Sequence, residues 1–184
     1  MPVGFSVRKA AQVIAFLVAE QGGSADMIKT VKLAYLADRK FLELYDRPIL
    51  KDDLYCLDHG PIDSMTLNLI KRDAGNDNKN LWSEYLTAVD PKTYVFGISQ
   101  NNIYFDELSE AEEAVLREVV QKFRKMKPFE LVEWLHDNCR EWSNPKGTSV
   151  SLSYADVFKA LGKKNPEKSV EHVNETRARF QATA

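Results

Sequence analysis

Apolar residues recur at helical spacing from the beginning of the chain. Between Val7 and Leu17 they fall on one face of a helix, which Ser6 can cap through its hydroxyl and Gly22 can end. This pattern predicts a helix over residues 7–20.

A longer apolar segment follows, and Ser24 or Asp26 can cap it. Little of its surface is wholly polar, which predicts a central helix. This helix must end before Pro48, because proline disfavours helical geometry in the residue before it. Pro61 suits the first position of a helix, so we expect a third helix over roughly residues 62–72.

The pattern changes in the middle of the chain. Residues 73–80 are mostly turn formers and predict an exposed loop. From Tyr85 to Phe105, turn formers interrupt runs of β-branched and aromatic residues. This segment predicts two or three short antiparallel strands.

Helical patterns then return. Ser109 and Glu112 have the spacing of a capping box, in which each side chain bonds the backbone N–H of the other residue. Pro128 can begin the next helix, and residues 143–150 predict a loop after it. The last predicted helices run from Tyr154 to Leu161 and onward from Asn165-Pro166.

Together these elements predict a mainly α fold. We expect a single compact helical domain with a small antiparallel β-hairpin or short sheet inserted mid-chain. A chain of 184 residues with 44% apolar residues suits one core. The helical domain is expected over residues 1–162, and residues 163–184 form a polar C-terminal helix extension that packs weakly or waits for a partner.

Composition narrows the class of protein. Twenty-five basic and twenty-seven acidic residues give a net charge of −2, so direct nucleic-acid binding is not expected. Residues 13–19 are apolar but too short to cross a membrane, and no membrane association is expected. Cys56 and Cys139 do not form the disulfide framework of a small secreted domain, which favours a cytoplasmic location.

Lysines gather around the start of the last predicted helix, at Lys159, Lys163, Lys164 and Lys168. Such a cluster resembles a phosphate-binding patch. Glu167 and Glu171 interrupt it, however, and we interpret it as a solvated face.

The main candidates for chemistry are the neighbours Asp58-His59 and His136-Asp137. If these side chains converged, they could form a general acid/base pair or a zinc site. Neither pair has the spacing of a known metal motif, and the chain has no nucleophile motif or phosphate-binding glycine loop. The sequence therefore predicts no metal and no cofactor, and a turn and a helix end explain the two pairs structurally.

Lys32 and Tyr35 lie three residues apart, hence on one helix face. They could present a cation and a phenol to a ligand, or Lys32 could extend from an apolar helix while Tyr35 buries its ring. Trp142 could anchor an interface. Its position after a helix end favours packing over Leu135 in the core.

Several of these residues form one ordered pattern: Lys32, Leu33 and Tyr35, then Gly60 and Pro61, then His136 and Trp142. The pattern resembles the SocA-like antitoxin family, also called the Panacea domain, and the resemblance runs from the first helix to Leu161. The sequence departs from the family pattern at Asp58 and His59, because many relatives carry an aromatic residue before Gly-Pro.

The resemblance implies binding rather than catalysis. Family members are antitoxins of two-gene toxin-antitoxin pairs in bacteria or their phages. They neutralise a cognate protein toxin encoded nearby by direct binding, and some deliver the toxin to a cellular protease as adaptors. The implied family-motif or partner-binding residues are Lys32, Tyr35, Asp58, His59, Gly60, Pro61, His136 and Trp142. The alternative is a small metal-dependent or acid/base hydrolase that uses the cluster of Asp58, His59, His136 and Asp137.

Overall fold

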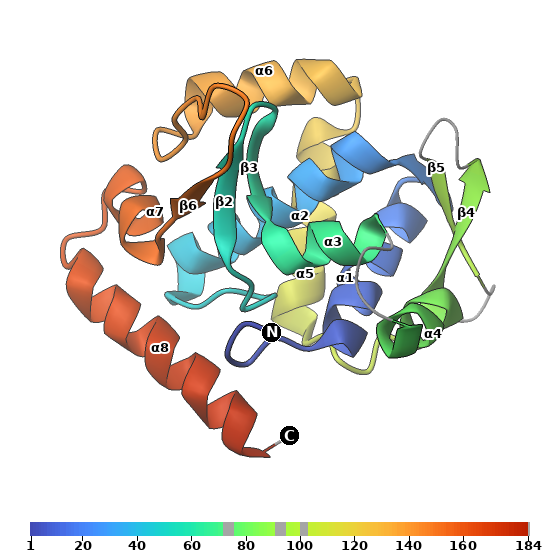
Figure 1. Cartoon of the computed structure of the whole chain (residues 1–184), viewed down its shortest axis with the longest axis horizontal. Coiled ribbons are helices and arrows are strands. Elements are labelled where there is room, and N and C mark those ends of the chain that lie inside the picture. Colours follow the sequence, from blue (N-terminus) through green and yellow to red (C-terminus); the bar gives the residue numbers. More distant parts are fainter. Residues whose placement is uncertain (72–75, 91–94, 100–102, 184) are drawn as a thin grey trace.

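The computed structural model describes residues 1–71, 76–90, 95–99 and 103–183 (Figure 1). The helices in this part of the chain are α1 (Val7–Glu20), α2 (Met27–Tyr45), α3 (Ser64–Ile70), α4 (Asn76–Tyr85), α5 (Glu110–Phe123), α6 (Pro128–Asn138), α7 (Tyr154–Ala160) and α8 (Pro166–Thr183). The strands are β1 (Ser24–Asp26), β2 (Leu54–Leu57), β3 (Gly60–Asp63), β4 (Leu86–Asp90), β5 (Val95–Ile98) and β6 (Val150–Leu152). The mainly α fold with short antiparallel sheets is confirmed.

The helices α1 and α2 form the centre of the molecule. Ser6 caps α1 by accepting a hydrogen bond from the Lys9 amide, and Asp26 caps α2 by accepting one from the Lys29 amide. Their apolar faces are buried, and α2 packs against α1, α5, α6 and β3. The central position predicted for the second helix is therefore confirmed.

Two three-stranded antiparallel sheets flank the helices (Figure 1). The first has the order β1-β5-β4, so two strands of the two or three predicted after Tyr85 form among the described residues and pair with a third strand from before α2. The second has the order β3-β2-β6, with Leu57 opposite Gly60 and Leu54 opposite Leu152. Residues 91–94 and 100–102 of the predicted β segment lie outside the described residues.

The predicted start of the third helix is wrong by two residues. Gly60 to Asp63 form strand β3, and α3 begins at Ser64. Pro61 is tolerated because β3 lies at the edge of its sheet, where a missing backbone donor costs little. The buried Asp52 carboxylate accepts bonds from the Met65 and Thr66 amides and fixes the first turn of the helix.

The predicted loop over residues 73–80 is wrong from residue 76 onward, because α4 begins at Asn76. Residues 72–75 lie outside the described part of the chain. The helix packs on α1 and buries Trp82 and Tyr85, so tertiary packing outweighs the weak helix preference of its polar first turn. The predicted loop over residues 143–150 likewise runs into strand β6 at Val150.

The last helix, α8, lies along one side of the molecule beside α7 (Figure 1). Its Val173 is fully buried, and Arg177 donates to the Val3 carbonyl and pairs with Asp53, each at 2.9 Å. The predicted polar extension is thus fixed to the helical body at these points. No helix among the described residues combines the length and the apolar character needed to cross a membrane.

Candidate functional site

The residues of the sequence pattern meet where α2, the β2–β3 hairpin and the end of α6 come together. We call Lys32, Tyr35, Gly60, Pro61, His136 and Trp142 the motif cluster. Helix α2 supplies the first two, the hairpin the next two, and α6 with its following turn the last two. The contacts of these residues show what each one does in the fold.

Lys32 is a buried lysine. Its Nζ donates to the carbonyl oxygens of Gly60 and Pro61, each at 3.1 Å, and therefore ties α2 to the hairpin. Burial lowers the pKa of Lys32 to about 7, although the negative potential of Asp63 opposes this shift. Gly60 adopts a φ of 98°, which glycine accepts without the strain that a side chain would add.

Three buried aspartates, Asp38 on α2, Asp52 before β2 and Asp63 at the end of β3, interact electrostatically, and the sequence pattern did not indicate them. Asp38 accepts bonds from the Ile49 and Leu50 amides, and burial raises its pKa to about 7. Asp63 has no hydrogen-bond partner for either side-chain oxygen among the described residues. Burial, followed by the neighbouring Asp38 and Asp52, raises the pKa of Asp63 well above its ordinary value.

Tyr35 and Arg39 share one buried partner, Glu141. The Tyr35 hydroxyl donates to Glu141 Oε1 at 2.7 Å, and the Arg39 guanidinium bonds both carboxylate oxygens at 2.6 and 3.2 Å. The Glu141 side chain is fully buried. Sequence analysis missed both charged residues, although Arg39 lies one helical turn after Tyr35 and Glu141 directly precedes Trp142.

Trp142 stacks on His136. Their ring centroids lie 3.8 Å apart with an interplanar angle of 9°, and Trp142 Nε1 donates to the Leu57 carbonyl at 2.9 Å. Trp142 packs against the hydrophobic core but stays partly exposed, so it lies at the edge of the core that we expected it to enter. His136 Nε2 is buried without a hydrogen-bond partner among the described residues.

The remaining acid/base candidates are exposed. Asp58 accepts a hydrogen bond from the Gly147 amide at 2.8 Å, and the His59 ring packs edge-on against Phe129. No hydrogen bond joins Asp58, His59, His136 or Asp137 to one another in the described part of the chain. There, too, no three His, Cys, Asp or Glu side chains are placed to hold a metal ion.

Cys56 and Cys139 are buried free thiols. Burial raises the pKa of both, that of Cys139 to about 12, so neither is poised as a thiolate nucleophile. Within the motif cluster, Lys32, Tyr35 and Trp142 each donate a hydrogen bond to another part of the protein. Three cavities of about 660, 380 and 250 Å³ elsewhere on the described surface contain no motif residue in their walls.

Comparison with known proteins fits this arrangement. Residues 31–143 match the family model described as antitoxin SocA-like, Panacea domain. No curated protein and no solved structure matches the chain. The matched segment contains the whole motif cluster and covers more than half of the 184 residues. The chain therefore belongs to the SocA-like antitoxin family, with a Panacea domain.

Proposed function

We propose that this protein is the antitoxin of a two-gene toxin-antitoxin pair of a bacterium or phage. It neutralises a protein toxin encoded beside it by direct binding in the cytoplasm. The family match over residues 31–143 is the observation that carries this proposal.

The state of the motif cluster supports binding over catalysis. Lys32 bonds two carbonyl oxygens, and Tyr35 bonds Glu141, so these polar groups stabilise the contact of α2 with the hairpin and the α6 end. A general acid or base must reach a substrate atom, and groups held in this way do not. The motif thus builds a rigid frame, and the surface outside it binds the toxin.

The proposed interface comprises one helical face of the domain together with α8. A stable complex of this kind buries roughly 1,200–2,000 Å² of surface. Two modes of neutralisation follow from direct binding: the antitoxin sequesters the toxin, or it also delivers the toxin to a cellular protease as an adaptor.

Co-expression tests this function. The adjacent gene, expressed alone, should arrest growth, and co-expression of this chain should restore it. Harmlessness of the adjacent gene, or persistent toxicity despite ample soluble antitoxin, would contradict the assignment. Rescue that is lost in a protease-deficient host would assign the adaptor mode, whereas rescue that persists there would assign sequestration.

A further inference from the structure

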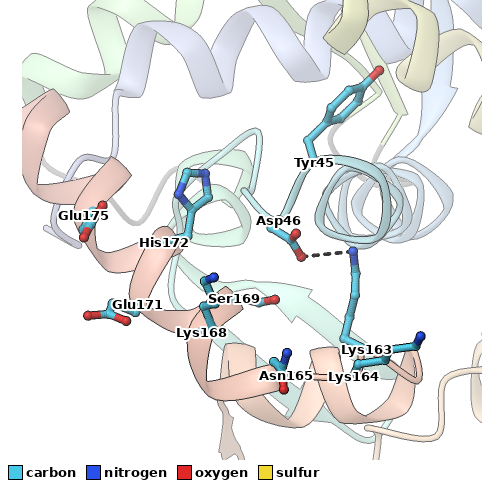
Figure 2. Close-up of a pocket in the computed structure, with 10 residues that line it drawn as sticks. All are labelled: Tyr45, Asp46, Lys163, Lys164, Asn165, Lys168, Ser169, Glu171, His172 and Glu175. Carbon is cyan, nitrogen blue, oxygen red and sulfur yellow. Dashed lines mark ion pairs between the residues drawn. The ribbon is translucent and has the colours of Figure 1, made fainter.

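The 660 Å³ cavity is a groove between the end of α2 and the start of α8 (Figure 2). Tyr45 and Asp46 form one wall, and residues 163–175 form the other. Tyr45 is 44% exposed and follows Leu44, which is 49% exposed. The Tyr45 ring packs on Phe41 with ring centroids 4.5 Å apart, and Figure 2 shows it directed away from α8. The groove therefore combines a polar wall with an accessible aromatic ring at its rim.

The unpaired charge of this groove is positive. Lys163 pairs with Asp46 at 3.0 Å, and Glu175 pairs with Arg179 at 3.6 Å (Figure 2 draws the first pair). Figure 2 also shows the Glu171 carboxylate and the Lys164 ammonium directed outward, on opposite sides of the groove. Glu171 has no ion pair among the described residues, and two lysines of the groove outnumber it. Lys164 and Lys168 are exposed and have no ion pair among the described residues. Their ammonium groups are available to a ligand.

We propose that this groove binds an acidic segment of the toxin, an inference that rests on the proposed function. Lys164 and Lys168 pair with its carboxylates, and Tyr45 packs on an adjacent apolar residue. Tyrosine is enriched in protein interfaces because its ring supplies contact area and its hydroxyl a hydrogen bond.

Charge spacing favours a protein over a nucleic acid. Duplex DNA carries one negative charge per about 1.7 Å of its axis. A continuous phosphate array along α8 would therefore run past the carboxylates of Glu167 and Glu171, which adjoin Lys168 along the helix. A peptide places its few carboxylates at the lysines and avoids this repulsion.

The groove also joins the family-matched domain to a segment outside the matched residues. Tyr45 and Asp46 lie within the family-matched residues, whereas Lys164 and Lys168 lie beyond residue 143. The contacts of Val173 and Arg177 hold α8 against the body and keep that wall in place. We therefore infer that the groove selects the partner that this particular antitoxin recognises.

Charge reversal tests the groove, with the purified product of the adjacent gene as the probe. Lys164→Glu/Lys168→Glu should weaken its binding about tenfold at low salt, and most of the loss should disappear at high salt. The matched control Lys71→Glu/Lys125→Glu makes the same change in net charge at exposed sites outside the groove and should bind like the wild type.

The outcomes separate the groove from the proposed function. If the wild type does not bind the probe, the proposed function fails. If the wild type binds and the groove variant binds equally well, or no worse than the control, the groove assignment fails alone. If the lysines instead support binding of a 20-base-pair DNA duplex with no effect on the probe, the acidic-peptide assignment is also overturned.

Discussion

The Trp142 indole lies flat on the His136 imidazole, with ring centroids 3.8 Å apart, and the same indole donates to the Leu57 carbonyl. One side chain therefore joins the end of α6 to strand β2. Lys32 makes the corresponding connection from α2 to strand β3 of the same hairpin. Two separated parts of the sequence pattern thus hold one β-hairpin in place.

Trp142→Ala should lower the free energy of unfolding by about 3 kcal/mol, because it removes the stacked ring and leaves a cavity at the core edge. Trp142→Phe should cost about 1 kcal/mol, since it keeps an aromatic ring but loses the bond to the Leu57 carbonyl. Urea denaturation measures both. A loss below about 1 kcal/mol for the alanine variant, together with lost toxin binding, would place Trp142 in the interface instead.

Glu141→Ala should destabilise the protein by about 3–5 kcal/mol, because it leaves the partly buried Arg39 charge without its partner. Tyr35→Phe should cost less, about 1.5–3 kcal/mol, since Arg39 still bonds the carboxylate when the hydroxyl is gone. Glu110→Ala, at an exposed position, is the control. Equal losses for Glu141→Ala and Glu110→Ala would contradict a structural role for the buried pair.

Stability should pass through a minimum near pH 7. The pKa of Asp38 rises from 3.8 to about 7 on folding, so the folded state binds more protons between these values and stability falls as pH increases. Asp63 acts in the same direction. The pKa of Lys32 falls from 10.5 to about 7, so the unfolded state binds more protons above pH 7 and stability rises.

Two variants separate the limbs of this pH profile. Asp38→Asn keeps an oxygen for the Ile49 and Leu50 amides and should flatten the fall between pH 5 and 7 by up to about 1.4 kcal/mol per pH unit. Lys32→Met should remove the rise between pH 7 and 9, below the range in which the raised pKa of Cys139 opposes it. Denaturant unfolding across this range measures the slopes, and unchanged slopes in both variants would refute the assignment of the two groups.

Gly60→Ala should cost about 1–2 kcal/mol because an alanine is strained at a φ of 98°. A β-carbon there would lie 3.6 Å from Lys32 Nζ, an ordinary contact, so the cost comes from the backbone. Gly147→Ala is the control, since that position has a φ of 81° and open space around it. Gly60→Ala should lower the free energy of unfolding more than Gly147→Ala does. Strain at residue 60 also shifts the carbonyl oxygens that accept from Lys32.

Helices with a capping residue or a proline at their first turn could be predicted from the sequence. The capping box at Ser109 and the proline at residue 128 begin α5 and α6 where expected. Strands β1 and β6 have only three residues each and depend on pairing with distant segments, which no local pattern specifies. Strand β3 could not be predicted locally either. Pro61 is acceptable in a strand only at the edge of a sheet, and the edge position is set by the fold.

The candidate site divides in the same way. The ordered pattern from Lys32 to Trp142 indicated which residues meet, because it resembles a family pattern. It did not indicate Glu141 or Asp63, since an acidic residue in a polar segment is normally exposed and only the folded packing buries it. The exposed positions of Asp58 and His59 likewise follow from the hairpin geometry.

Titration of the purified protein into the purified product of the adjacent gene tests the central claim most directly. Isothermal calorimetry should show saturable binding with a negative heat-capacity change, as apolar surface is buried. The mixture should elute from size-exclusion chromatography as a complex. The absence of heat and of a complex, with both proteins folded, would contradict neutralisation by direct binding.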